Sequence, residues 1–293
     1  MKTTVIGLGL IGGSIAIDLR RAGLATELVG IDLNPANAAR AVELGLVDKI
    51  DNEGLAISTA DLVVLAIPVN ALSQLLPSVL DAVKKKAVVI DTGSTKRMIC
   101  RSIDHHPNRG QFVASHPIAG TENSGPDAAF EGLFRGKTNI ICEQEKSSKE
   151  ALMIANRVFT LLGLNTIFME PEEHDKHVAY VSHLSHVSSF LLGQTVLDIE
   201  RDEKNIFALA GSGFASTVRL AKSSPDMWAP IFEQNSEFLS QALLEYIMHL
   251  QKFQYFLMKR DGKELQRIMK DANRIREILN GIEYKQVKQV QEN

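Results

Sequence analysis

Residues 5–13 read VIGLGLIGG, a stretch in which three glycines follow the spacing G-x-G-x-x-G between a short apolar run and a helical pattern. The first glycine permits a tight strand-to-helix turn, the second lets the backbone approach a pyrophosphate, and the third lets the helix pack close to the strand. The N-terminus of that helix then faces the phosphates. The sequence therefore predicts a dinucleotide-binding turn whose cofactor contacts include Gly7, Gly9, Leu10, Ile11 and Gly12.

The next predicted strand ends in VGID, and it places Asp32 about 20 residues after the last glycine of the turn. A carboxylate there accepts hydrogen bonds from a ribose 2′-hydroxyl and repels a 2′-phosphate. The alternative is a glycine-rich turn in which Asp32 only caps a helix. The order of strand, glycine turn, helix, strand and acid favours a cofactor site, with NAD rather than NADP as the cofactor.

Outward from this turn, short β-branched runs alternate with helical patterns. Strands are predicted at residues 3–6, 27–31, 62–67, 87–90, 112–115, 139–142 and 166–169, and helices at 11–22, 35–44, 72–83 and 149–162. Continuous apolar strands such as LVVLAI are buried on both faces, which is typical of a parallel sheet covered by helices. We therefore expect an N-terminal α/β domain over residues 1–170, a Rossmann-type, doubly wound and mostly parallel sheet.

After Pro171 the strand signal disappears. The remaining pattern is helical, over residues 172–200, 203–222, 226–260 and 263–280. Apolar residues form a stripe along the third of these helices, and such a helix usually packs against other helices or a second subunit. We expect a C-terminal all-helical domain over residues 171–293 that binds substrate and forms a dimer.

Composition excludes several classes of partner. The net charge is −3 and the basic residues are scattered, so nucleic acid is not expected. No apolar run approaches the ~20 residues that span a bilayer. Cys100 and Cys142 show neither metal-ligand spacing nor a disulfide framework. We expect a soluble cytoplasmic protein that holds no metal and binds neither nucleic acid nor a membrane.

Three predicted strands end in residues with possible roles at a site. LVVLAI stops at Pro68, AVVI runs into DTGSTK with Ser94, and FVAS runs into His116. In open parallel sheets, ligands bind outside the carboxyl ends of the strands. A neutral histidine there accepts a proton from an alcohol, which a dehydrogenase that oxidises a hydroxyl needs beside its nicotinamide.

Ser94 has three possible roles: it orients the imidazole, binds substrate, or caps a helix. Ser94 and His116 together also suggest a Ser–His hydrolase. That alternative leaves the dinucleotide turn without a purpose, so we favour the dehydrogenase.

The segment EEHDKHVAYVSHLSH (residues 172–186) contains four histidines. At about 100° per residue, His174 and His177 lie on the face of a helix opposite His183 and His186. Four ligands cannot converge from one unbroken helix, so we expect no zinc site. We expect one pair to face the site and the other to be structural.

Arg219 follows GSGFASTV on a mainly apolar helical pattern. A buried arginine needs an anion, and its planar fork suits a carboxylate. Two interpretations remain open: Arg219 clamps an acidic substrate, or it forms an internal salt bridge.

With these motifs in place, the chain resembles the prephenate dehydrogenase family over nearly its full length. The resemblance rests on GLGLIGGS, DTGSTK, SHPIAGTENSG, HDKHVAYVSHLSH, the GGGF-type segment GSGF before Arg219, and PDMW. It implies NAD-dependent oxidative decarboxylation of prephenate to 4-hydroxyphenylpyruvate, a step of tyrosine biosynthesis. It also implies a homodimer formed by the helical domain and, in some members, inhibition by tyrosine.

The resemblance assigns roles to individual residues. His116 accepts a hydrogen bond from the ring C4 hydroxyl, Ser94 helps to hold both, and Arg219 binds a substrate carboxylate. The remaining residues that it implies around the substrate are Thr121, Glu122, His183 and His186. Members often carry GGGFRD before a Thr-Arg pair, whereas this chain has GSGFASTVR with Val218. Since the acid is absent, an ion pair that gates the site is not expected there.

Three alternative functions compete with this one. Arogenate dehydrogenase performs the same chemistry on a substrate with an amino group in place of the keto oxygen. A β-hydroxyacid dehydrogenase needs a lysine with an asparagine four residues later, but Tyr180 follows Lys176 at that distance. A catalytically silent NAD-binding regulator would not need His116, Ser94 and Arg219 together.

Overall fold

The computed structural model describes residues 1–202 and 205–281. It divides into two compact units, Met1–Ser236 and Glu237–Asn293. All strands and all predicted site residues belong to the first unit. The predicted domain boundary at residues 170–171 separates an α/β part from a helical part of the chain, and it stays a prediction.

One eight-stranded sheet forms the centre of the first unit, in the order β3-β2-β1-β4-β5-β6-β7-β8. The strands are β1 (Lys2–Ile6), β2 (Glu27–Ile31), β3 (Lys49–Ile50), β4 (Leu62–Leu65), β5 (Val88–Asp91), β6 (Phe112–Pro117), β7 (Thr138–Cys142) and β8 (Asn165–Met169). All neighbouring strands are parallel except β6 and β7, which pair antiparallel. The predicted mostly parallel, doubly wound sheet is confirmed.

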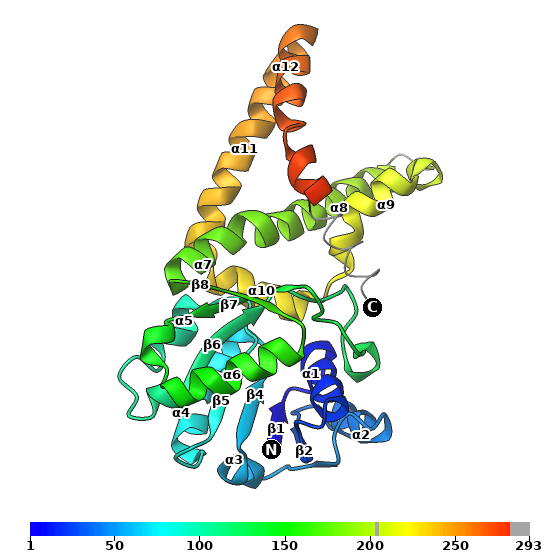
Figure 1. Ribbon diagram of the computed structural model, residues 1–293. Coiled ribbons are helices and arrows are strands. Elements are labelled where there is room, and N and C mark those ends of the chain that lie inside the picture. The colour runs from blue at the N-terminus through cyan, green and yellow to red at the C-terminus, as the bar shows by residue number, and fades with distance from the viewer. Residues whose placement is uncertain (203–204, 282–293) are drawn as a thin grey trace. The chain divides into compact units, whose positions relative to one another are not determined.

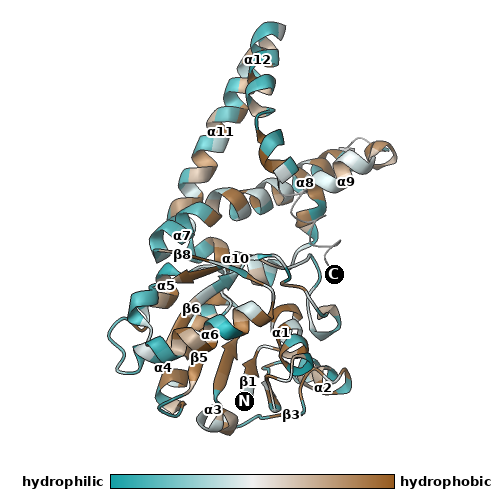
Figure 2. Cartoon of the chain, viewed as in Figure 1, coloured by the Kyte–Doolittle hydropathy of each residue, from teal (hydrophilic) through white to brown (hydrophobic). Residues whose placement is uncertain are grey.

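Helices cover both faces of this sheet (Figure 1). On one face, α1 (Leu10–Arg21) and α6 (Lys149–Leu161) bury apolar side chains against the strands, and α2 (Pro35–Glu43) packs beside them. On the other face lie α3 (Leu55–Thr59), α4 (Val69–Ala82), α5 (Arg97–Arg101) and α10 (Pro225–Gln234). Figure 2 shows the central strands β4 and β5 in the colours of apolar residues, as expected for strands buried on two sides.

The strand order reverses between β1 and β4, because the chain proceeds to one side through β2 and β3 and to the other through β5 and β6. In open α/β sheets the ligand crevice lies at such a switch point, outside the carboxyl ends of the strands. Three segments emerge there: the glycine turn after β1, the loop after β5, and the end of β6. The sheet therefore brings together residues that are distant in the sequence.

Strand β3 was not predicted, since two residues are too few to show an alternating pattern. The helix predicted over residues 172–200 is one helical run but not a uniform one. It consists of α7 (Pro171–Val178), a π-helical segment (Ala179–His183) and α8 (Leu184–Asp202).

The helix predicted over residues 203–222 is wrong in part. The described residues there form short pieces, namely Ile206–Leu209, α9 (Ser212–Val218) and Arg219–Lys222. Residues 203 and 204 lie outside the described part of the chain. The helix predicted over residues 226–260 is interrupted at Asn235, which separates α10 from α11 (Ser236–Met258).

The second unit contains most of α11 and the helix α12 (Gly262–Ala272), whose first turn is capped by the Asp261 side chain. Helix α11 exposes apolar side chains along its length, at Leu244, Ile247, Met248, Leu250, Phe253 and Leu257. Among residues 1–202 and 205–281, no helix combines the length and the apolar character that crossing a membrane requires.

Candidate active site

The glycine turn between β1 and α1 tolerates no side chain at two of its positions. Gly7 has φ of +94°, and a Cβ there would lie 2.2 Å from the Ala66 carbonyl oxygen. A Cβ on Gly12 would lie 2.0 Å from the Gly7 carbonyl oxygen. The first position needs a left-handed backbone, and the second needs close contact between helix and strand. Both predicted roles agree with the geometry.

Gly9 differs from these two because its surroundings are open. A Cβ on Gly9 would meet nothing closer than the Gly125 amide nitrogen at 3.9 Å. Gly9 is also the N-cap of α1, and no side chain caps the helix. The first N–H groups of a helix, here those of Leu10 and Ile11, have no partner within it. Free space beside unpaired N–H groups fits a pyrophosphate.

Asp32 directly follows β2, and its carboxylate is fixed by two backbone amides. Oδ2 accepts a hydrogen bond from Leu8 N and Oδ1 accepts one from Asn34 N, each at 2.8 Å. The carboxylate thus lies beside the glycine turn, where a ribose diol would meet it. Pro68 lies three residues after β4 ends at Leu65, and it is the N-cap of α4.

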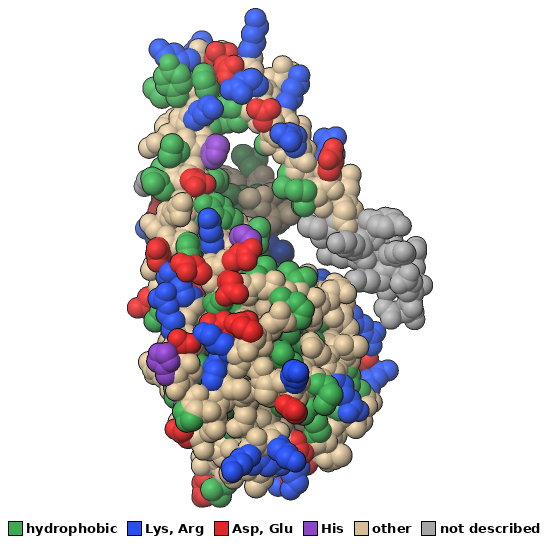
Figure 3. Space-filling model, turned by 60° about the vertical axis from the view of Figure 1, so that its left-hand side comes forward, with side chains coloured by type: hydrophobic (Ala, Val, Ile, Leu, Met, Phe, Trp, Pro, Cys, Tyr) green, Lys and Arg blue, Asp and Glu red, His purple; other side chains and the backbone are tan. Residues whose placement is uncertain are grey.

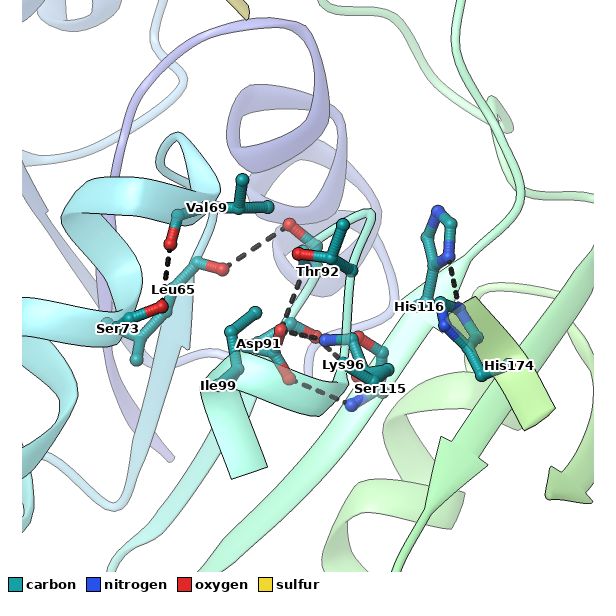
Figure 4. A network of polar contacts seen from close by, with 12 residues as sticks. Leu65, Val69, Ser73, Asp91, Thr92, Lys96, Ile99, Ser115, His116 and His174 are labelled. Carbon is teal, nitrogen blue, oxygen red and sulfur yellow. Dashed lines mark hydrogen bonds and ion pairs between the residues drawn. The ribbon is translucent and has the colours of Figure 1, made fainter. Parts of the chain in front are cut away.

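His116 lies on β6 and is partly buried. Its Nδ1 lies 2.8 Å from Nε2 of His174 on α7 (Figure 4). Burial lowers the pKa of the His116 imidazole well below its ordinary value of 6.5, and the charges of His174 and Lys96 act in the same direction. A histidine with this pKa is neutral near pH 7, which is the form that accepts a proton.

Ser94 does not orient this imidazole in the structure. It lies in the loop between β5 and α5, and within the described residues its hydroxyl makes no hydrogen bond. Lys96, not Ser94, is the N-cap residue of α5, and α5 has no side-chain cap. The hydroxyl is therefore free to contact a ligand, and its predicted catalytic role stays a prediction.

A buried ion pair lies behind His116. Lys96 and Asp91 are fully buried and in contact, and Lys96 Nζ also donates to the Ser115 carbonyl oxygen at 2.8 Å (Figure 4). Asp91 Oδ1 accepts a hydrogen bond from Ser115 N at 2.9 Å. These contacts tie the end of β5 to the residue that precedes His116. A buried charge without such partners is costly, so separating Lys96 from Asp91 is unfavourable. The pair therefore holds the loop between β5 and α5 in place.

The four histidines are not divided as predicted. His174 and His183 are both buried, with 0% and 1% of the residue exposed, whereas His177 is exposed. The prediction assumed an unbroken α-helix, but the π-helical segment between them changes the angle per residue. Such segments are frequent at functional sites. The helix therefore turns one histidine of each predicted pair inward.

His183 is held by Asn235, the buried residue between α10 and α11. Asn235 Nδ2 lies 3.0 Å from His183 Nδ1, and it donates to the Asp175 carbonyl oxygen at 2.7 Å. Burial lowers the pKa of His183 to about 4. The break that separates α10 from α11 thus supplies a side chain to the site.

Arg219 is not buried, contrary to expectation, since 53% of its side chain is exposed. Its Nη1 lies 3.1 Å from Glu122 Oε2, which is the salt bridge that one of the two open interpretations described. The acid comes from the loop after β6 and not from the GSGFASTVR segment, which has no acid to offer.

His186 lies close to Arg219 and stacks on an aromatic ring. Its ring centroid is 3.5 Å from that of Trp228, at an interplanar angle of 26°. Burial lowers the pKa of His186, and the charge of Arg219 adds to that effect. The indole N–H of Trp228 is buried without a hydrogen-bond partner, so this donor is available to a bound molecule. Thr121 is exposed, and its Oγ1 accepts a hydrogen bond from Asn123 N at 3.2 Å.

The sequence assigned no site role to five residues that contact the site histidines or the buried pair behind His116, namely Lys96, His174, Asp175, Trp228 and Asn235. A signal existed for the first three, because the lysine stands in DTGSTK and the Asp lies inside HDKH beside a histidine. In the described part of the chain, no three His, Cys, Asp or Glu side chains gather as metal ligands.

Comparisons with known proteins agree on one family. Residues 15–168 match the family model described as prephenate dehydrogenase, nucleotide-binding domain, and residues 170–271 match prephenate dehydrogenase, dimerization domain. The prephenate dehydrogenase of Bacillus subtilis is 31% identical over 94% of this chain and 76% of its own length.

Solved structures of dehydrogenases are also similar over nearly the whole chain. The prephenate dehydrogenase of A. aeolicus, in complex with hydroxyphenyl propionate and NAD+, has a TM-score of 0.86 at 31% identity, with 95% of this chain and 98% of that chain covered. Synechocystis arogenate dehydrogenase has a TM-score of 0.74 at 29% identity, with 95% and 100% covered.

Proposed function

The chain belongs to the prephenate dehydrogenase family, and on that premise we propose that it catalyses the NAD-dependent oxidative decarboxylation of prephenate to 4-hydroxyphenylpyruvate. The observation that carries the proposal is the position of His116. A neutral imidazole stands at the carboxyl end of β6, on the same sheet edge as the glycine turn and Asp32. An alcohol-oxidising site needs this combination of base and dinucleotide site.

NAD, when bound at the glycine turn, supplies the acceptor for the hydride that leaves ring C4. Asp32 is placed to accept hydrogen bonds from the ribose hydroxyls, and the N–H groups at the start of α1 are placed to bind the phosphates. His116 Nε2 takes the proton of the C4 hydroxyl, whose oxygen becomes a ring carbonyl as the hydride leaves. Decarboxylation then leaves the electron pair of the broken C–C bond in the ring, which becomes aromatic, and the resulting phenolate oxygen takes up a proton. The ring carboxylate leaves as carbon dioxide.

Arg219 is proposed to bind a carboxylate of the substrate. Its Nη1 lies 3.1 Å from Glu122 Oε2, and the guanidinium is close enough to His186 to affect the pKa of that imidazole. With about half of its side chain exposed, the guanidinium is accessible to an incoming acid. Thr121, Glu122, His183 and His186 are proposed to surround the substrate, and the free hydroxyl of Ser94 to contact its ring oxygen.

Arogenate is the second candidate substrate, because an arogenate dehydrogenase is among the similar structures. The test is to mix the purified protein with NAD and either prephenate or arogenate, and to follow the absorbance of the reduced nicotinamide. Turnover of prephenate supports the first proposal, and turnover of arogenate alone replaces it with the second. A protein that binds NAD but reduces it with neither would be a regulator.

Three further properties are proposed for this protein. A homodimer formed by the helical part is supported by the match to a dimerization domain and by the apolar side chains that α11 exposes. Figure 3 shows such hydrophobic side chains at the surface among charged ones. A cytoplasmic location is supported by two cysteines that are both free thiols. Tyrosine shares the hydroxyphenyl group of the product, so we expect it to compete with substrate.

A further inference from the structure

A chain of hydrogen bonds runs from a carboxylate to His116. Asp175 Oδ1 lies 2.8 Å from Nδ1 of His174, and Nε2 of His174 lies 2.8 Å from Nδ1 of His116. The two imidazole rings meet edge to face, with centroids 5.0 Å apart at 63°. His116 belongs to β6, whereas His174 and Asp175 belong to α7. The two histidines are 58 positions apart in the sequence.

The carboxylate at the start of this chain is fixed as an acceptor. Lys96 N donates to Asp175 Oδ1 at 2.7 Å, and Arg97 N donates to Oδ2 at 2.9 Å. Asn235 Nδ2 donates to the backbone carbonyl of the same residue at 2.7 Å. Asp175 is 1% exposed, so no solvent competes for its oxygens. Both carboxylate oxygens of Asp175 therefore act as hydrogen-bond acceptors.

This arrangement determines the tautomer of each histidine in turn. Because Asp175 accepts, Nδ1 of His174 carries the proton, and Nε2 of a neutral His174 is then an acceptor. His116 must therefore donate through its own Nδ1–H. The lone pair of His116 is left on Nε2, which makes no hydrogen bond within the described residues and points away from His174 in Figure 4.

We propose that His174, held by Asp175, is a positioning residue that fixes His116 as the Nδ1–H tautomer with its proton-accepting nitrogen directed at the substrate. The inference rests on the proposed function. When Nε2 of His116 takes the proton of the substrate hydroxyl, the Nδ1–H bond to His174 is kept, so the imidazolium retains its partner. The negative charge of Asp175 lies one ring away and compensates the new positive charge.

The variant that tests this is His174→Phe. Phenylalanine keeps a ring of similar size against His116 but offers neither nitrogen, and it leaves the backbone contacts of Asp175 in place. His174→Gln is the conservative counterpart, because its side-chain oxygen is able to accept from His116 Nδ1–H. His177→Phe is the control, since that histidine is exposed on the same helix.

Two measurements are made on each full-length protein. The ¹⁵N shifts of the His116 ring report its tautomer without any substrate. Steady-state kinetics report kcat and KM with NAD in excess. We expect Nδ1–H in the wild type and Nε2–H, the form that imidazole prefers in water, in His174→Phe. We expect kcat of His174→Phe to fall by about 10²-fold or more with NAD affinity unchanged, and His174→Gln to recover part of it.

Each outcome decides a different claim. If His116 is the Nε2–H tautomer in the wild type, or if His174→Phe keeps its kcat, the positioning role is overturned. It is also overturned if His174→Phe and His174→Gln lose NAD affinity and thermal stability together with kcat, since that indicates a structural role. If the wild type shows Nδ1–H but turns over neither prephenate nor arogenate, the positioning role stands and the proposed function falls.

Discussion

Arg219 Nη1 lies 3.1 Å from Glu122 Oε2, although 97 positions separate the two residues. The arginine belongs to the helical segment after α9 and the glutamate to the loop after β6. The guanidinium therefore has an anionic partner within the protein. A substrate carboxylate must compete with Glu122 for it.

Replacing Arg219 by alanine is expected to raise KM for the substrate by about 10- to 100-fold, because a charge-assisted contact to a carboxylate is lost. Glu122→Gln should leave KM unchanged or lower it, since it removes the competing acid. The melting temperature should hardly move in either variant, because an exposed ion pair contributes at most about 1 kcal/mol. Steady-state kinetics and calorimetry check this. An unchanged KM with reduced stability would make Arg219 structural.

Replacing His116 by asparagine is expected to reduce kcat by ~10²–10⁴, the usual loss when a general base is removed. Affinity for NAD should be nearly unchanged, because the glycine turn and Asp32 do not depend on this side chain. Rapid-mixing kinetics and NAD titration by fluorescence measure the two effects. Turnover at the wild-type rate would refute the assigned role.

Replacing Asp32 by asparagine is expected to weaken NAD binding by about 10- to 100-fold, the range for losing hydrogen bonds to a charged group. Affinity for NADP should rise relative to NAD, because the charge that repels a 2′-phosphate is gone. Asp61→Asn is the control, since Asp61 likewise accepts a backbone hydrogen bond, from Lys2 N at 2.8 Å, but before β4 at the opposite end of the sheet. Equal effects of both variants would contradict the prediction.

Replacing Lys96 by methionine is expected to lower the free energy of unfolding by about 3–5 kcal/mol, because Asp91 would remain as a buried, uncompensated charge. The matched control is Lys84→Met. Lys84 also pairs with an aspartate, Asp61 at 2.6 Å, but 42% of each side chain is exposed, so a change below about 1 kcal/mol is expected. Urea unfolding measures both, and similar losses would show that burial does not decide the effect.

Stability is expected to fall on acidification between pH 6.5 and about 4, because burial lowers the pKa of His183 to about 4. In this window the unfolded chain binds a proton that the folded protein excludes, so the free energy of unfolding rises with pH. His183 contributes about 3 kcal/mol over the whole window. Urea titrations at several pH values should show a shallower dependence for His183→Asn. The exposed His249→Asn should behave like the wild type, and an identical slope in all three would disprove this account.

The amino-acid sequence by itself determined the α/β fold and the dinucleotide turn. Those features depend on local order: buried strands must be continuously apolar, and the turn needs glycine where a Cβ would collide with Ala66 or with Gly7. The positions of His116 and Asp32 at strand ends followed from the same reasoning, because parallel strands all end at one edge. The two-residue strand β3 could not be found this way, since it has no pattern to detect.

Only the tertiary structure decided which residues touch His116. Its partner His174 and the Asp175 behind it lie on a helix 58 positions later, and the pairing depends on how that helix packs against β6. The π-helical segment Ala179–His183 turned His183 inward, which no count of 100° per residue predicts. Likewise, the acidic partner of Arg219 is Glu122 in the loop after β6, and not a residue of the GSGFASTVR segment. Side-chain partners are set by packing between elements, whereas strands and turns are set by the residues within them.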